Sequence, residues 1–166
     1  MEGLESERTY DQHDQHREKR VLVIDDDPTL ITLISEGLSL VGGYDVAIAT
    51  NGAMGLERFY ETMPDCVVVD VRMPGLNGYQ FVRALRGDPM TMETPIIVLS
   101  AMAQDRDELA GMLAGADSYL FKPVKITDLL VAIDKAMTLT AEKRHERKQW
   151  LSGYTSEYTP AEGGRS

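Results

Sequence analysis

The chain has 166 residues, a formal net charge of −10, 43% hydrophobic and 27% charged residues. This size suits a single folded domain, and the composition excludes a wholly disordered chain. No apolar run approaches the roughly 20 residues of a membrane span, and the first twenty residues are too polar for a signal peptide. The single cysteine, Cys66, cannot form an internal disulfide, so the sequence predicts a cytoplasmic protein.

Acidic residues are concentrated in the central part of the chain. Residues 21–140 contain 17 acidic and 8 basic residues, whereas residues 141–166 contain 4 acidic and 5 basic residues. A surface with this excess of negative charge repels nucleic acid phosphates. The sequence therefore predicts neither direct nucleic acid binding nor a membrane association.

The chain divides into four predicted segments. Residues 1–19 are polar and are expected to form a flexible N-terminal segment. Residues 20–139 hold the regular apolar pattern of the folded domain. Residues 140–151 follow the end of that pattern and predict a charged helical extension that runs into solvent. Residues 152–166 are expected to be a disordered tail.

Five short apolar runs recur along the folded segment, and each is too short for a helix. They are nearly continuous in apolar residues, which is typical of parallel strands that are covered on both faces. These predicted strands are VLVI (21–24), VAIA (46–49), CVVVD (66–70), PIIVLS (95–100) and SYLF (118–121).

Stretches of about a dozen residues with helical spacing separate the predicted strands. Asp27, Asn51 and Asn77 are placed to cap the first three helices, because their side chains accept hydrogen bonds from the first helical turn. The predicted helices cover about 28–41, 51–62, 77–85, 105–114 and 126–137. Regular alternation of strand and helix predicts an α/β fold, an open parallel sheet with helices on both faces.

Polar side chains follow four of the predicted strands. Asp25 and Asp26 come after the first strand, Asp70 ends the third, Ser100 ends the fourth, and Lys122 follows the fifth. The carboxyl ends of parallel strands meet at one edge of a sheet, where ligand chemistry collects. We therefore expect these five side chains to lie together.

This set of side chains suits phosphoryl transfer. Clustered carboxylates repel one another, and Mg²⁺ relieves the repulsion while leaving room for phosphate oxygens. A carboxylate can act as a nucleophile toward phosphorus and form an aspartyl phosphate. Lys122 can supply positive charge and Ser100 a hydrogen-bond donor to the transferred group. The sequence thus predicts a phosphoaspartate site.

Four segments, VLVIDDDP, VVVDVRMPGLNG, PIIVLSA and SYLFKPV, occur in this order over residues 20–139. Together they resemble the signature segments of the receiver domain of bacterial two-component response regulators. The resemblance implies a single flavodoxin-like (βα)5 domain, with a five-stranded parallel sheet in the order 2-1-3-4-5.

The resemblance also implies which residues hold the metal and accept the phosphoryl group. Asp70 resembles the phosphoacceptor of the family. Asp25 and Asp26 resemble its acidic pair, and Asp25, Asp26, Asp70 and the backbone carbonyl of Arg72 are the expected Mg²⁺ site.

Lys122 and Ser100 resemble the remaining catalytic residues of the family. Ser100 also resembles the switch hydroxyl that bonds the phosphoryl group, and Tyr119 resembles the aromatic switch residue. The resemblance further implies a cis peptide bond between Lys122 and Pro123.

The implied function is that of a phosphorelay receiver. The expected phosphodonor is a sensor histidine kinase or a histidine phosphotransfer protein. Phosphorylation is expected to change the face built from residues 105–114, 118–121 and 126–137, which then controls a downstream protein target or forms a homodimer. Beyond Mg²⁺-dependent self-phosphorylation and slow autodephosphorylation, no enzyme activity is expected.

Three other interpretations compete with this one. A phosphohydrolase of the haloacid dehalogenase type needs an acid two residues after the nucleophile, where this chain has Arg72. A flavodoxin needs a hydroxyl- and glycine-rich phosphate loop where this chain has DDDP. A phosphate-independent receiver-like interaction module stays open as an alternative, and so does the choice between a stand-alone receiver and a fragment of a longer regulator.

Overall fold

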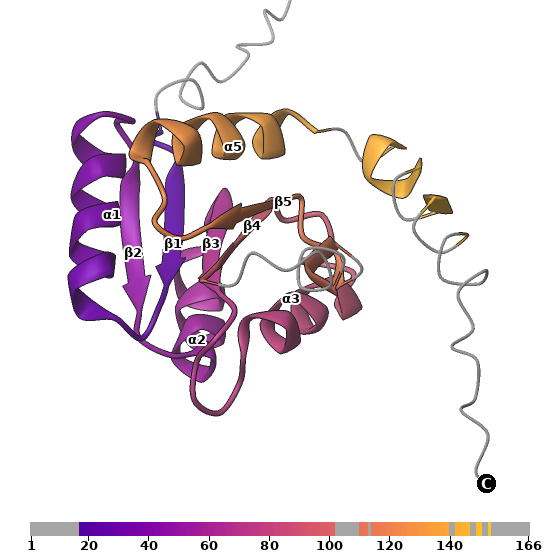
Figure 1. Ribbon diagram of the computed structural model, residues 1–166. Coiled ribbons are helices and arrows are strands. Elements are labelled where there is room, and N and C mark those ends of the chain that lie inside the picture. Colours follow the sequence, from indigo (N-terminus) through magenta and orange to yellow (C-terminus); the bar gives the residue numbers. More distant parts are fainter. Residues whose placement is uncertain are drawn as a thin grey trace, which may run out of the picture.

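The computed structural model describes residues 17–101, 110–112, 114–139, 142–146, 149–150 and 153. Five parallel strands form one sheet in the order β2-β1-β3-β4-β5 (Figure 1). This order confirms the predicted flavodoxin-like sheet. The strands are β1 (Arg20–Ile24), β2 (Asp45–Ala49), β3 (Cys66–Asp70), β4 (Ile96–Ser100) and β5 (Ser118–Phe121).

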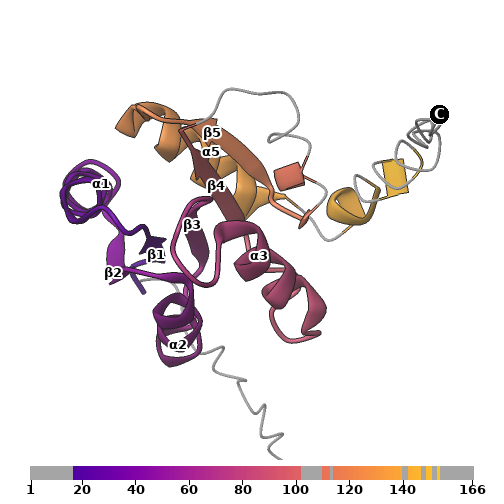
Figure 2. The ribbon, with the colours of Figure 1, turned by 60° about the horizontal axis from the view of Figure 1, so that its bottom comes forward.

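Helices cover both faces of the sheet, as predicted. Helices α1 and α5 lie on one face, and α2 and α3 lie on the other (Figures 1 and 2). Their bounds are α1 (Pro28–Leu40), α2 (Gly52–Thr62), α3 (Gly78–Gly87) and α5 (Ile126–Thr138). None of the described helices is long and apolar enough to cross a membrane.

Parts of four sequence predictions fall on residues that the structure does not describe. Within the predicted helix 105–114, only residues 110–112 and 114 are described, and they are helical. Most of the predicted flexible segment 1–19 and of the predicted disordered tail 152–166 also lies outside the described residues, as does part of the predicted extension 140–151. These predictions stay as they were made.

The sheet separates two apolar clusters. Successive residues of a strand point to opposite faces, so Leu22 and Ile24 pack toward α2 and α3, whereas Val21 and Val23 pack toward α1 and α5. This explains why the buried strands are apolar at every position except their ends. The strands β2 and β5 are only partly buried, because each lies at an edge of the sheet.

Three predicted helix caps are confirmed. The Asp27 side chain accepts a hydrogen bond from the Thr29 amide at 2.9 Å, and Asn51 accepts one from the Met54 amide at 2.8 Å. Asn77 begins α3 with a reciprocal capping box, in which the Gln80 side chain accepts the Asn77 amide at 2.9 Å. These caps fix where the chain leaves each strand end and enters the next helix.

The described residues of the predicted charged extension 140–151 are helical, and one of them is buried. Helix α5 ends at Thr138, Leu139 is extended, and residues 142–146 are helical again. Within this second helical stretch, Arg144 is only 4% exposed. A run of charged residues gives no pattern that separates one buried member from its solvated neighbours, so the sequence did not indicate this contact.

Candidate functional site

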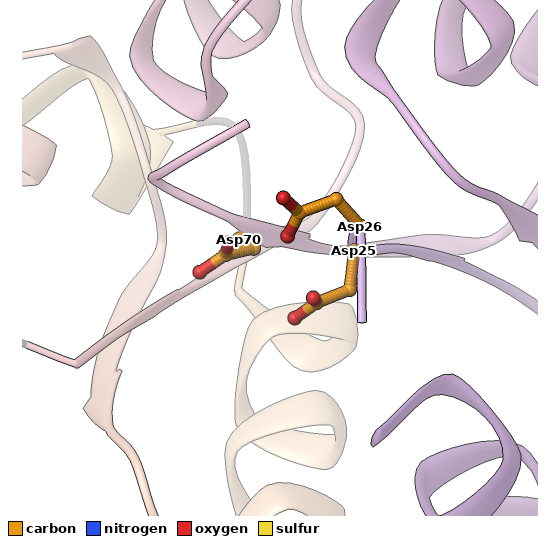
Figure 3. A group of neighbouring side chains, drawn as sticks. All are labelled: Asp25, Asp26 and Asp70. Carbon is orange, nitrogen blue, oxygen red and sulfur yellow. The ribbon is translucent and has the colours of Figure 1, made fainter. Parts of the chain in front are cut away.

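Three carboxylates meet at the carboxyl edge of the sheet. Asp25 and Asp26 directly follow β1, and Asp70 is the last residue of β3. The parallel register pairs Ile24 with Val69, which brings the residues that follow them side by side. One carboxylate oxygen from each aspartate lies within 4.8 Å of the other two (Figure 3). The predicted convergence of these residues is therefore seen in the structure.

The three carboxylates differ in exposure. Asp25 is 1% exposed and Asp70 is 4% exposed, whereas Asp26 is open to solvent. A cluster of carboxylate oxygens with one solvent-facing member fits a hard divalent cation such as Mg²⁺, which takes oxygen ligands and keeps several waters. The donor set therefore suits the expected metal.

Lys122 connects two of these carboxylates. Its ammonium nitrogen Nζ lies 2.8 Å from Oδ2 of Asp25 and 3.0 Å from Oδ1 of Asp70. The Lys122 backbone amide donates to the Ser100 carbonyl at 2.7 Å, and the peptide bond to Pro123 is cis, as the resemblance implied. One ammonium among three carboxylates leaves an excess of negative charge at this edge.

Burial and the neighbouring charges shift the pKa values of Asp70 and Lys122. Burial raises the pKa of the Asp70 carboxyl, and the charges of Asp25 and Asp26 raise it further, against the opposing effect of Lys122. Burial disfavours the charged form of Lys122, but its hydrogen bonds to Asp25 and Asp70 outweigh that effect and raise the pKa of Lys122. Lys122 is therefore an ammonium at neutral pH.

The hydroxyl and aromatic residues of the prediction lie on the neighbouring strands. Ser100 ends β4 and is 2% exposed, and the register of β3 with β4 pairs Asp70 with Leu99, one residue before Ser100. Tyr119 lies in β5 and is half-buried. Arg72 is exposed two residues after Asp70, and its backbone carbonyl stays a predicted metal ligand.

The loop after β3 is held against the Asp70 backbone. The Gly78 amide donates to the Val71 carbonyl at 3.0 Å. A Cβ atom on Gly78 would collide with the backbone carbonyl oxygen of Asp70. Only glycine lets the start of α3 approach so closely, so Gly78 helps to fix the position of Asp70. The sequence around Gly78 carries no signal of this close approach.

The structure adds one aromatic side chain to the surroundings of Tyr119. The Tyr79 hydroxyl oxygen lies 3.4 Å from the Tyr119 hydroxyl oxygen. In the sequence, Tyr79 has the helical spacing of a core residue together with Val82 and Leu85, and this spacing carries no signal of a contact with a residue 40 positions away.

Comparison with known proteins agrees with the resemblance to receiver domains seen in the sequence. A family model for the response regulator receiver domain matches residues 21–134. The transcriptional regulatory protein PrrA of Mycobacterium leprae is 42% identical over 114 residues, which cover 69% of this chain and 48% of PrrA. The protein PilH of Pseudomonas aeruginosa is 36% identical over 118 residues, which cover 71% of this chain and 97% of PilH.

A solved structure also resembles this chain. The chemotaxis protein CheY4 of Vibrio cholerae gives a TM-score of 0.67 at 28% identity, and the match covers 72% of this chain and 99% of CheY4. The chain spans about half the length of PrrA and nearly the whole length of PilH. The residues matched by the family model include the aspartate cluster and reach from β1 into α5.

Proposed function

This chain belongs to the response regulator receiver domain family, and on that premise we propose that it is the phosphoacceptor of a two-component phosphorelay. Asp70 takes a phosphoryl group from a phosphohistidine on a sensor histidine kinase or a histidine phosphotransfer protein. The observation that carries this proposal is the cluster of Asp25, Asp26 and Asp70, with Lys122 within 3.0 Å of both Asp25 and Asp70.

In the proposed reaction, a carboxylate oxygen of Asp70 attacks the phosphorus atom of the phosphohistidine. A new O–P bond forms and the N–P bond breaks, and the imidazole nitrogen leaves with the bonding electron pair and takes up a proton from solvent. The Lys122 ammonium and the Ser100 hydroxyl then face the oxygens of the transferred group, where they offset negative charge and donate a hydrogen bond.

Asp25, Asp26 and Asp70 would hold Mg²⁺, and the backbone carbonyl of Arg72 is a further proposed ligand. When bound, the ion supplies positive charge that reduces the repulsion between the carboxylates and an incoming phosphoryl group. Beyond this self-phosphorylation and the slow loss of the phosphoryl group, we propose no enzyme activity.

Phosphorylation is proposed to act through Ser100 and Tyr119 on the face that contains β5, α5 and residues 105–114. This face would contact a downstream protein in the cytoplasm or a second copy of the chain. Light scattering before and after phosphorylation distinguishes these two partners, since only a homodimer doubles the mass of the isolated protein.

The proposal is tested by intact mass spectrometry after incubation with acetyl phosphate, with and without Mg²⁺. We expect a gain of one phosphoryl group, about 80 Da, that requires Mg²⁺ and is lost in Asp70→Asn. The matched control is Asp27→Asn, because Asp27 is an exposed neighbour and asparagine caps α1 equally well. This control should gain the same mass as the wild type.

Two results would contradict the proposal. A folded wild-type protein that gains no mass under any of these conditions would favour the phosphate-independent interaction module. A mass gain that persists in Asp70→Asn would place the phosphoryl group on another residue.

A further inference from the structure

The chain that follows α5 contacts the domain through one buried side chain. The described residues of this C-terminal extension are 142–146 and 149–150, and all of them are helical (Figure 1). The His145 and Gln149 side chains lie 2.9 Å apart, a contact that joins the two described parts. Among these residues only Arg144 is buried, and the others are exposed. We therefore expect the position of the extension to depend chiefly on Arg144.

The Arg144 guanidinium meets acceptors from three separate parts of the fold. Its Nε donates to Oδ1 of Asp117 at 2.8 Å, and its Nη1 donates to Oε2 of Glu93 at 3.2 Å. Its Nη2 donates to the Ala136 carbonyl at 3.1 Å. Asp117 precedes β5, Glu93 lies in the loop before β4, and Ala136 is in the last turn of α5. Each nitrogen of the guanidinium group thus has an acceptor of its own.

The acceptors are held in place by the domain itself. The Asp117 side chain is 1% exposed, and its second oxygen, Oδ2, accepts bonds from Arg86 of α3 at 3.1 Å and from the Ile96 amide at 2.8 Å. The third acceptor is a backbone carbonyl near the end of a helix, where cationic side chains are favoured. A planar fork of N–H donors fits three such acceptors, whereas a lysine ammonium presents one nitrogen.

We propose that Asp117, Glu93 and the Ala136 carbonyl form a guanidinium-binding site whose occupant is Arg144, and that this contact fixes the extension to the domain. The site lies at the amino ends of the strands, opposite the aspartate cluster. The inference does not depend on phosphorylation of Asp70. Its consequence is that the chain beyond α5 starts from a fixed position on the domain rather than from the free end of a helix.

The size of the effect follows from the bonds that Arg144 makes. Arg144→Gln removes three hydrogen bonds, two of them to carboxylates, and hydrogen bonds to charged groups are among the strongest. We expect the ratio of released to docked extension to rise at least about tenfold. Asp117 keeps its contacts with Arg86 and the Ile96 amide in this variant, so the domain should stay folded.

The test uses Trp150, the single tryptophan of the chain, as a reporter within the extension. Time-resolved fluorescence anisotropy is recorded on the full chain for the wild type, Arg144→Gln and Arg144→Lys. With a docked extension the anisotropy decays as the whole domain tumbles, whereas a released extension adds faster local motion. The matched control is Arg58→Gln, the same chemical change in an exposed ion pair with Glu61 at 3.1 Å.

We expect the fast motion to be small in the wild type and in Arg58→Gln, and to dominate in Arg144→Gln. Arg144→Lys should resemble Arg144→Gln, because one ammonium cannot serve three separate acceptors. Fast motion that already dominates in the wild type, or that is unchanged in Arg144→Gln, would overturn the docking. Wild-type behaviour of Arg144→Lys would overturn the guanidinium site, since a point charge would then suffice.

A milder variant decides the matter if Arg144→Gln does not fold. Glu93 is the most exposed of the three acceptors, with a side chain that is 49% exposed, so its substitution should leave the domain folded. Glu93→Lys places a cation next to Arg144, and the repulsion should raise the released fraction at least about twofold. A Trp150 anisotropy decay identical to that of the wild type would then overturn the proposal.

Discussion

The carboxyl and amino ends of the parallel strands, called here the carboxyl edge and the amino edge, differ in how their buried charges are compensated. At the carboxyl edge, Asp25, Asp26 and Asp70 form one cluster, and the Lys122 ammonium contacts two of them, Asp25 and Asp70. At the amino edge, Asp117 directly precedes β5 and is contacted by two guanidinium groups, from Arg86 at 3.1 Å and from Arg144 at 2.8 Å, together with a backbone amide.

The amino-edge network is saturated with partners. The two carboxylate oxygens of Asp117 each accept a guanidinium N–H, and the Ile96 amide adds a bond of 2.8 Å. Arg144 also donates to Glu93 and to the Ala136 carbonyl, so the network connects the end of α5 to the loop before β4. We expect a buried carboxylate with this many hydrogen-bond donors to be needed for the stability of the fold.

The carboxyl edge is under-compensated by comparison. Among the residues that the structure describes here, its negative charge exceeds its positive charge, and the pKa of Asp70 is raised by burial and by its acidic neighbours. Binding of a cation stabilises such a site, because it reduces the repulsion between the carboxylates. The comparison teaches that buried charge alone does not mark a functional site, whereas buried charge without sufficient partners does.

The largest expected effect comes from breaking the amino-edge network. Asp117→Asn removes the buried negative charge that Arg86 and Arg144 share and leaves Arg144 only its contact with the exposed Glu93 carboxylate. We expect the free energy of unfolding to fall by about 3–5 kcal/mol, measured by urea denaturation. The control is Glu61→Gln in the exposed pair with Arg58, which should cost at most about 1 kcal/mol. A cost for Asp117→Asn as small as the control would show that the network is not a support of the fold.

An effect of intermediate size on stability is expected when Mg²⁺ binds to the carboxylates at the carboxyl edge. At a Mg²⁺ concentration ten times the dissociation constant, the free energy of unfolding should rise by about 1.4 kcal/mol. Asp26→Asn should abolish most of this gain and change the metal-free stability little, because Asp26 is exposed. Glu57→Gln, an exposed change on α2, should keep the gain. Equal responses in Asp26→Asn and the wild type would exclude Asp26 as a ligand.

The smallest effect is a gain of stability when the excess charge is removed. Because the pKa of Asp70 is raised in the folded protein, the ionised carboxylate disfavours folding at neutral pH. Asp70→Asn should therefore increase the metal-free free energy of unfolding at pH 7 by about 1 kcal/mol.

The stability difference between Asp70→Asn and the wild type should also depend on pH. The contribution of a group with a raised pKa is fully favourable below its unfolded value, about 3.9 for aspartate, and is lost as the pH rises through the folded value. The advantage of Asp70→Asn should therefore shrink as the pH falls from 7 toward 4. Denaturation curves at several pH values measure it, and a constant or growing advantage would contradict the charge argument.

The sequence by itself determined the strands, the caps and the positions of the predicted site. Asp27, Asn51 and Asn77 could be recognised because a cap bonds within its own first turn. Asp25, Asp26 and Asp70 could be placed together because all parallel strands end at one edge. These signals are local, or depend only on strand direction, and so they survive without knowledge of the packing.

Only the tertiary structure decided which side chains pair across elements. The contact of Tyr79 with Tyr119 spans 40 positions, and that of Arg144 with Asp117 spans 27. A charged or aromatic residue carries no mark of its distant partner, since its local spacing is the same whether it is solvated or buried. The physical reason is that pairing depends on how helices pack on the sheet, which no short segment encodes.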